Sequence, residues 1–442
     1  MLKMLLLIQD FIMHTLKNNS VTLQRTFLFL ILVTTSWIIS GQGLPSGIPQ
    51  KLGLSSERLN RIDSVMNDYI KNGKMPGMVA MIIRHGKVGY FKSFGMKDIE
   101  GRKEMSNDAI FRIASMSKAI TTVAVMTLYE EGYFLLTDPV SKFIPEFKNP
   151  KVVMKSPTSD SIILIPAKGE ITIRQLLNHT SGITYGDELQ VRYYRQAGMT
   201  VGLKPTVGTI AEMIKKLGSL PLISQPGEEF HYGMSVDVLG YLIEVISKMP
   251  LDEFLRKNIF EPLKMKDTYF TLPPDKFPRL ATLYKMGIDG KLIVSAEYFQ
   301  YPKVQTYFSG GAGLVSTAAD YSRFAQMLLN KGELDGKRIL NRKTIELMTS
   351  NSIGDLYIFN PFRHNGIMGD KFGYGFGIRT ERGVYDELES IGSFGWDGAF
   401  YTRFWVDPKE DLIGIFLSQV DNYWSENLIG KFKNLVYQSI VN

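Results

Sequence analysis

Apolar and polar positions follow two different patterns at the start of the folded chain. The segment SSERLNRIDSVMNDYIKNG opens with a capping serine, has apolar residues at helical spacing and ends at Gly73. The next segment, GMVAMIIRHGKVGYFKSFG, consists of two apolar runs around His85-Gly86, which is typical of a β-hairpin. The pattern therefore predicts a helix followed directly by a hairpin.

The C-terminal part of the chain also mixes the two patterns. AADYSRFAQMLLNKG predicts an amphipathic helix, and FYTRFWVDPKEDLIGIFLSQV predicts two strands around a proline-containing turn. Residues from about 120 to 290 have a mostly helical pattern with loops. Because strands distant in sequence can pair, we expect an α/β (α+β) fold in which an antiparallel sheet lobe from both chain ends packs on a mostly helical lobe. A cleft between two lobes is a usual place for a small-molecule site.

The N-terminus has the features of a targeting segment. A stretch containing Lys17 and Arg25 precedes an apolar run, residues 26–39, which small residues follow. This order is typical of a secretory signal peptide. The run has 14 residues, whereas a membrane-spanning helix needs about 20. We therefore expect residues 1–43 to be a signal peptide or, less favoured, an uncleaved membrane anchor. Residues 44–442 would form the functional domain, with the helical lobe inserted, in the periplasm or outside the cell.

Length, charge and cysteine content each exclude some classes of protein. A chain of 442 residues exceeds the about 250–300 at which one core stops growing, so two lobes are expected. The formal net charge is +7, but no basic run with interleaved aromatic residues occurs, so nucleic acid is not an expected partner. The chain has no cysteine, which excludes disulfides, thiol catalysis and thiolate metal sites. The oligomeric state stays open.

Ser115 and Lys118 are the strongest candidates for chemistry. They lie three residues apart before an almost continuously apolar segment, and no other Ser-x-x-Lys occurs in the chain. On a helix these positions share one face, so the side chains would touch. A lysine ammonium stabilises a forming serine alkoxide, and a neutral lysine can take its proton. A solvated surface pair is the alternative, but such a pair would lie on an amphipathic helix.

Other catalytic motifs are missing from the sequence. The histidines show no metal-ligand spacing, and neither a Gly-x-Ser-x-Gly elbow nor a His-Glu-x-x-His motif occurs. These absences disfavour an α/β-hydrolase and a zinc protease. Acyl chemistry at Ser115 would need no metal and no cofactor, and its expected partner is a small-molecule acyl substrate.

Four segments together resemble the serine β-lactamase and penicillin-binding-protein superfamily: FRIASMSKAIT, LLNHTSGI, GLVSTAADYSRFAQMLLN and DELESIGSFGWDGAFYTRFWVDP. The resemblance is strongest to class C β-lactamase-like esterases and peptidases, and it runs from about Gly47 to near the end. It implies a β-lactamase/transpeptidase-like fold of one α/β lobe and one mostly helical lobe. It also implies that LNHTSGI, which contains His179, is a structural turn and does not supply a catalytic base.

The resemblance implies a tyrosine as the second site element. The segment EEFHYGMSVDVLGYLIEVISK supplies Tyr232, and its continuation from Asp237 to Gly240 is similar to the esterase version. A nearby cation such as Lys118 favours a phenolate, so Tyr232 can act as a general base. Met234 occupies the place of the usual asparagine, which weakens a β-lactamase interpretation more than one of general acyl transfer.

The third family motif corresponds to Trp396-Asp397-Gly398, followed by Ala399. Relatives carry Lys-Thr-Gly, His-x-Gly or Trp-x-Gly here, on a strand that lines the cleft. Gly398 would let a substrate approach the backbone closely. The N–H groups of Ser115 and Ala399 would form the oxyanion hole. Trp396 in place of lysine removes a cation that would hold a substrate carboxylate.

Asp397 suggests a preference among substrates. At the cleft rim it would repel a substrate carboxylate ~4 Å away by ~1 kcal/mol in water, or ~4 kcal/mol at an effective dielectric of 20. β-Lactams and peptides with free C-termini carry that carboxylate, whereas simple esters do not. We expect Asp397 to select neutral or cationic acyl compounds, unless strand alternation points it out of the cleft.

These observations predict an exported serine hydrolase that cleaves a carboxylic ester or related small acyl compound. Ser115 attacks the carbonyl, Lys118 and Tyr232 move its proton, and water activated by Tyr232 releases the acyl group. The alternatives are a β-lactamase or D-alanyl peptidase, and a non-catalytic, cell-wall-sensing relative. That last class should have lost Ser115 or Lys118, and both are present.

Overall fold

The structure, a computed structural model, describes most of the chain after residue 42. The described residues are 43–186, 189–199, 208–295, 306–356, 358–359, 371–381, 388–421 and 427–441. The expected signal peptide or anchor therefore lies, apart from Gly43, outside the described residues. Residues 43–442 form one compact unit. None of the helices in the ranges above is long and apolar enough to cross a membrane.

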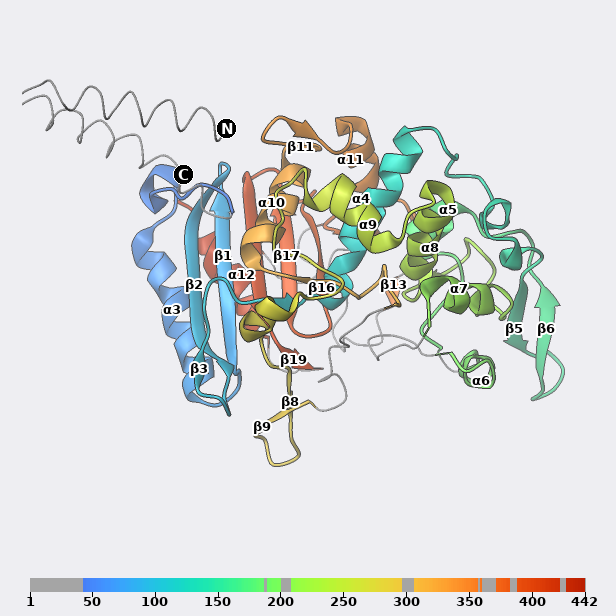
Figure 1. Ribbon diagram of the computed structural model, residues 1–442, viewed down its shortest axis with the longest axis horizontal. Helices are drawn as coiled ribbons and strands as arrows, with labels where there is room; N and C mark the ends of the chain where they lie inside the picture. Colours follow the sequence, from blue (N-terminus) through green and yellow to red (C-terminus); the bar gives the residue numbers. More distant parts are fainter. Residues whose placement is uncertain are drawn as a thin grey trace, which may run out of the picture. The chain divides into compact units, whose positions relative to one another are not determined.

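An eight-stranded antiparallel sheet joins the two ends of the chain (Figure 1). Its strands, in spatial order, are β14 (Lys371–Phe372), β15 (Gly377–Ile378), β16 (Phe394–Gly398), β17 (Thr402–Asp407), β18 (Leu412–Ser418), β1 (Gly77–Arg84), β2 (Lys87–Asp98) and β3 (Lys103–Glu104). β1 pairs with β18, so an N-terminal strand and a C-terminal strand are neighbours. The predicted sheet from both chain ends is confirmed.

The predicted hairpin is the turn between β1 and β2. His85 and Gly86 both have positive φ, 53° and 69°. Two successive left-handed residues are typical of a two-residue type I′ turn, whose twist matches that of the flanking strands.

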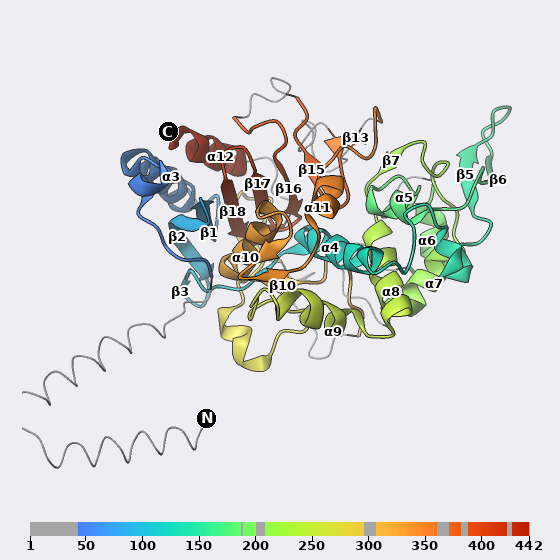
Figure 2. The same ribbon diagram turned by 90° about the horizontal axis from the view of Figure 1, so that it is seen from above.

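Helices cover both faces of the sheet and build the helical lobe (Figure 2). α3 (Ser56–Lys71), capped by Ser55, and α12 (Leu428–Gln438) bury their apolar residues against one face. α10 (Ala318–Leu329) packs on the other face, and α4 (Ser117–Glu130) packs against α8 (Ser235–Ser247). The remaining α-helices in the described residues are α5 (Ile173–Leu177), α6 (Val191–Gln196), α7 (Ile210–Gly218), α9 (Leu251–Leu255) and α11 (Arg342–Met348).

Short elements connect these layers. Short strands also pair outside the large sheet. The pairs are β4 (Phe111–Arg112) and β10 (Val315–Ser316), β5 (Lys151–Lys155) and β6 (Ile162–Pro166), β7 (Phe230–His231) and β13 (Ile358–Phe359), and β11 (Glu333–Leu334) and β12 (Lys337–Arg338). In a three-stranded sheet, β8 (Tyr284–Met286) lies between β9 (Leu292–Val294) and β19 (Val420–Asp421). The short helices are η1 (Pro49–Leu52), η2 (Ala114–Met116), η3 (Val140–Lys142), η4 (Pro145–Phe147), η5 (Arg256–Phe260), which is a π-helix, and η6 (Pro274–Arg279).

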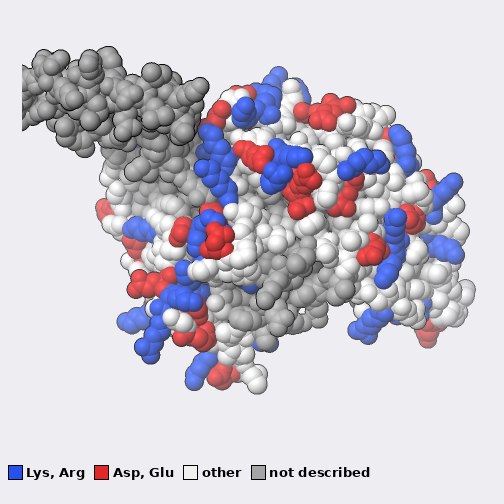
Figure 3. Space-filling model, in the orientation of Figure 1, with Lys and Arg blue, Asp and Glu red and all other residues white. Residues whose placement is uncertain are grey.

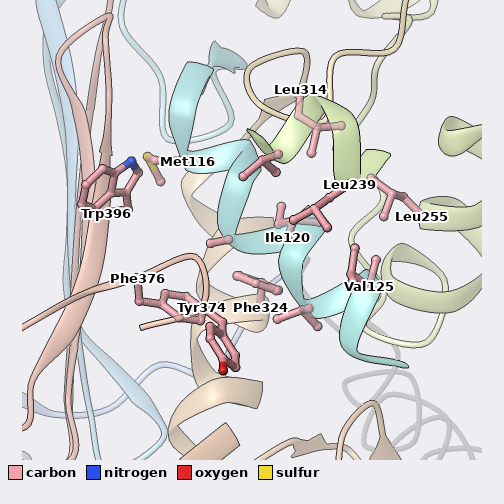
Figure 4. Packing of buried hydrophobic residues seen from close by; sticks show 14 of the residues in the cluster. Met116, Ile120, Val125, Leu239, Leu255, Leu314, Phe324, Tyr374, Phe376 and Trp396 are labelled. Carbon is pink, nitrogen blue, oxygen red and sulfur yellow. The ribbon is translucent and has the colours of Figure 1, made fainter. Parts of the chain in front are cut away.

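α4 is buried along most of its length, which explains its almost continuous apolar pattern. Side chains on several of its sides, including Ile120 and Val125, are fully buried. Figure 4 shows α4 in the middle of the core, with Leu239 of the helical lobe on one side and Trp396 of the sheet, near Met116, on the other. The N-terminus of this central helix is therefore where the two lobes meet.

Charged side chains of both signs are mixed over the surface. On the face shown in Figure 3, Lys and Arg residues are interspersed with Asp and Glu. The described residues visible there form no single-sign field of the kind that attracts nucleic acid.

A close contact between β17 and β18 gives a test of the sheet packing. Gly414 lies opposite Trp405, and a Cβ atom on Gly414 would come within 2.1 Å of the indole ring. We expect Gly414→Ala to lower the free energy of unfolding by about 1–3 kcal/mol through overpacking, as measured by urea denaturation. Gly169→Ala is the control, since nothing lies within 4 Å of its Cβ position. Equal stabilities of the two variants would contradict the packing described.

Candidate active site

Ser115 lies in η2, one turn before α4, and is only half-buried. Ala114 before it has φ 44°, a left-handed conformation that is uncommon for a residue with a Cβ atom. Strain of this kind persists where the surrounding structure holds a functional side chain in place. Ser117 is fully buried and its Oγ accepts from the Leu314 N–H at 3.2 Å, so it points away from the site.

Lys118 is fully buried, and its ammonium group donates three hydrogen bonds. Nζ donates to Ser115 Oγ at 3.2 Å, to Tyr185 Oη at 2.9 Å and to the Gly311 carbonyl at 2.8 Å. Burial acts to lower the pKa of Lys118, but interactions with the Tyr185 and Tyr232 hydroxyls outweigh it and leave the pKa above its ordinary value. The predicted contact between Ser115 and Lys118 is present, and Lys118 is a cation that can stabilise an alkoxide.

Tyr232 lies between β7 and α8, directly beside Lys118. The Lys118 Nζ is 4.6 Å from the centroid of its ring, and its hydroxyl accepts from Trp396 Nε1 at 3.0 Å. The structure thus brings together Ser115, Lys118, Tyr232 and Trp396. A Cβ atom on Gly233 would lie 2.5 Å from the Ile183 carbonyl, so a larger residue would not fit directly after Tyr232 without a shift of the backbone.

Tyr185 is the site residue that the sequence did not indicate. Its hydroxyl accepts from Lys118, and its ring packs edge-on against Tyr232 with centroids 5.8 Å apart. Burial raises the pKa of Tyr185, and the charge of Lys118 only partly offsets this. The one available signal was its position two residues after LNHTSGI, a segment that was expected to be structural.

His179 is buried behind Tyr232. Its ring lies 4.9 Å from the Tyr232 ring and 5.5 Å from that of Phe372, and neither ring nitrogen has a hydrogen-bond partner among the described residues. Its carbonyl accepts from the His231 N–H at 2.8 Å, which ties this turn to β7. Burial, reinforced by the charge of Lys118, lowers the pKa of His179 well below its ordinary value. His179 therefore packs as a neutral ring against Tyr232, in keeping with a structural turn.

The end of β16 lies against the turn that carries Ser115. A Cβ atom on Gly398 would lie 2.3 Å from the Ile113 carbonyl, so only glycine fits this approach. Ala399, the next residue, packs with Ala114. The two predicted oxyanion donors, the N–H groups of Ser115 and Ala399, therefore belong to adjacent segments.

Asp397 is not part of this arrangement. Along β16, Trp396 faces Tyr232 and Asp397 projects from the opposite face of the sheet. There it lies opposite Arg403 of β17, and its Oδ1 is 3.3 Å from the Arg403 Nε. The expectation that Asp397 lines the cleft and repels substrate carboxylates is therefore corrected, because strand alternation turns it away and its charge is paired.

The arrangement fits nucleophilic acyl chemistry. An accessible serine touches a buried ammonium, and two phenol groups lie beside that ammonium. Within the described ranges, no group of three or more histidine or acidic residues is placed to hold a metal ion. Each group that the site does contain can move a proton or stabilise negative charge.

Comparison with known proteins identifies the family. Residues 62–433 match the Beta-lactamase family, so the chain belongs to it. Protein Rv1367c of Mycobacterium tuberculosis is 33% identical over 78% of this chain and 86% of its own length. Esterase EstB of Burkholderia gladioli is 31% identical over 49% of this chain and 53% of its own length. The structure of EstCE1, described as a hydrolase with promiscuous acyltransferase activity, superimposes with a TM-score of 0.73 at 25% identity, over 86% of this chain and 98% of that chain. The predicted superfamily and fold class are confirmed.

The buried state of His179 predicts a pH dependence of stability. Because its pKa is lowered only in the folded protein, the unfolded chain binds the proton more tightly. Stability should therefore fall as the pH drops below about 6.5, by up to ~1.4 kcal/mol per pH unit from this group. We expect His179→Asn to flatten the urea-unfolding stability profile between about pH 6.5 and 5, because it removes the titrating group.

His85→Asn is the matched control for this experiment. His85 also has a left-handed φ, 53° against 59° for His179, and asparagine tolerates that conformation, but its side chain is exposed. An unchanged profile in His179→Asn, or the same flattening in His85→Asn, would contradict the interpretation.

Proposed function

We propose that this protein hydrolyses small carboxylic esters through an acyl-serine intermediate. The observation that carries the proposal is the ammonium of Lys118, which has no exposed surface and donates to both Ser115 Oγ and Tyr185 Oη. Burying a cation costs free energy, so stabilisation of the fold does not explain why Lys118 is buried. Beside a half-buried serine, the same charge stabilises the alkoxide that must form during attack. The similarity to EstB and EstCE1 supports this assignment.

The contacts divide the chemistry among the site residues. Ser115 Oγ attacks the substrate carbonyl, and the N–H groups of Ser115 and Ala399 would receive the oxyanion. Tyr232 is the favoured proton acceptor, because its oxygen accepts from the Trp396 N–H and its ring lies beside the Lys118 ammonium, so that negative charge on this oxygen has two stabilising neighbours. It then protonates the leaving alcohol and later activates the water that releases the acyl group. Tyr185 holds Lys118 in position.

The residues around Ser115 favour neutral substrates. Trp396 occupies the place where β-lactam-processing relatives carry a cation, and its indole N–H already donates to the Tyr232 hydroxyl. A substrate carboxylate would therefore find no charged partner in this motif. The expected preference for esters over β-lactams and D-alanyl peptides now rests on Trp396 and on Met234, and no longer on Asp397.

Acyl transfer to an alcohol is a second candidate function. It shares every step up to the acyl-enzyme and differs only in the group that attacks it. The activity named for EstCE1 supports this possibility. We also propose that the protein is exported, which rests on the pattern of residues 1–43.

The nucleophile can be tested by covalent labelling. Ser115→Ala should abolish labelling by a fluorophosphonate probe, as measured by intact-mass spectrometry, because the Ser115 hydroxyl is the nucleophile that accepts from the Lys118 ammonium. Ser117→Ala should still be labelled, since Ser117 hydrogen-bonds to Leu314 and points away. Full labelling of Ser115→Ala in a folded sample would contradict the assignment of Ser115 as the nucleophile.

A substrate panel on the purified protein tests the reaction class. It comprises short p-nitrophenyl esters with and without an added alcohol, a chromogenic cephalosporin and D-alanyl peptides. Turnover of esters alone supports the proposal, and a transferred acyl product in the presence of the alcohol supports the second candidate. Cephalosporin turnover equal to ester turnover would overturn the proposed preference.

The shared role of Lys118 and Tyr232 predicts non-additive losses. Tyr232→Phe should lower kcat by roughly 10²–10⁴-fold, the usual contribution of a general acid–base group. Adding Lys118→Ala should cost little more, because residues that act as a unit are strongly non-additive. Tyr185→Phe should cost less than Tyr232→Phe, since it removes only a hydrogen bond to Lys118. Losses that multiply in the double variant would show that the two residues act independently.

A further inference from the structure

Asp237 is a buried carboxylate that the mechanism above does not use. It lies in the first turn of α8, five residues after Tyr232, and is 3% exposed. A buried carboxylate is costly unless its oxygens are hydrogen-bonded or paired with a charge. The groups that surround Asp237 therefore indicate its purpose.

Asp237 holds a glycine-containing loop between α4 and α8. Its Oδ1 accepts from Ser309 Oγ at 2.5 Å, from the Gly311 N–H at 3.4 Å and from Tyr307 Oη at 3.4 Å. All three donors belong to one short segment. Burial raises the pKa of Asp237 above its ordinary value, and these donors, together with the charge of Lys118, offset part of this.

The same loop holds Lys118 from the other side. The Gly311 carbonyl accepts from Lys118 Nζ at 2.8 Å, and the Gly310 carbonyl accepts from Thr121 Oγ1 at 2.8 Å. Glycine is needed here, because a Cβ atom on Gly310 would lie 2.7 Å from the Val236 carbonyl. The loop is therefore packed between the two helices, with Asp237 on one side and Lys118 on the other.

Asp237 and Lys118 approach each other across Gly311. A Cβ atom on Gly311 would lie 2.6 Å from Asp237 Oδ2 and 3.5 Å from Lys118 Nζ. The two groups are thus at most roughly 6 Å apart, within the range where opposite charges shift each other's protonation. The other titratable groups that face Lys118 are Tyr185, Tyr232 and the neutral His179. Tyr307 and Tyr185 face Asp237.

We propose that Asp237 is a positioning residue that keeps Lys118 protonated and directed at Ser115. It does so by its negative charge and by fixing the Gly311 carbonyl that Lys118 contacts. Of the titratable groups named around Lys118, Asp237 is the one carboxylate. The inference rests on the proposed function, because it assigns a role toward the same nucleophile.

The test is Asp237→Asn, which keeps the size of the side chain and one acceptor oxygen but removes the charge. We expect kcat on a neutral p-nitrophenyl ester to fall by about 10- to 100-fold with little change in KM, and the alkaline limb of the pH profile to move down by about one unit or more. The rate at which a fluorophosphonate labels Ser115 should show the same alkaline shift. Because labelling needs no ester turnover, failure of this inference is distinguishable from failure of the proposed function.

Two further variants separate positioning from stability. Asp320→Asn removes another buried carboxylate in a first helical turn, which accepts from the Asp267 N–H at 2.6 Å and Thr268 Oγ1 at 3.0 Å. Any loss should be confined to the melting temperature, and kcat and the pH profile should stay unchanged. Ser309→Ala removes one donor from Asp237 and leaves its charge, so the acidic limb should move to higher pH and the alkaline limb should stay.

If Asp237→Asn does not fold, the pH profile of Ser309→Ala tests the proposed role of Asp237. A wild-type acidic limb in Ser309→Ala would overturn the proposal. It would also be overturned by a wild-type pH profile in folded Asp237→Asn, or by equal kinetic losses in Asp237→Asn and Asp320→Asn.

Discussion

The ammonium of Lys118, held entirely out of water, is the constraint on which the site depends. A buried cation needs partners for each of its protons, and here these are a serine hydroxyl, a phenol and a main-chain carbonyl. These partners come from η2, the loop after α5 and the segment before β10. The helical lobe, α4 and the loop between them must therefore be assembled before the nucleophile is in place.

Much of the fold could be predicted because its signals are local. The hairpin at His85-Gly86, the capped helix after Ser55 and the strands around the turn before Leu412 each follow from a short pattern. Ser115 and Lys118 could be recognised for the same reason, since both lie within four residues of sequence. The apolar surroundings of Lys118 were also visible, as the continuous apolar run of α4.

The remaining site residues depend on contacts between distant segments. Tyr185 reaches Lys118 from a loop, and its position after LNHTSGI, a segment expected to be structural, did not indicate that contact. Asp397 illustrates the opposite case, since its motif suggested a role but the strand direction decided its place. A one-residue alternation along β16 sends Trp396 to Tyr232 and Asp397 to Arg403. A motif gives the positions of residues along the chain. The face of the sheet on which each side chain lies depends on how β16 pairs with β17.

The pairing of β1 with β18 has a consequence for how the protein acquires its structure. Met81 and Ile415 are neighbours in the sheet although roughly 330 residues separate them, and contacts of such long range slow folding. β1 is synthesised long before β18, and until β18 exists the apolar side chains of β1 lack part of their packing partners. The central sheet can therefore be completed only after the last strands have been synthesised. Trp396 belongs to this sheet and contacts Tyr232, so the candidate active site is complete only once the C-terminal part of the chain has been made.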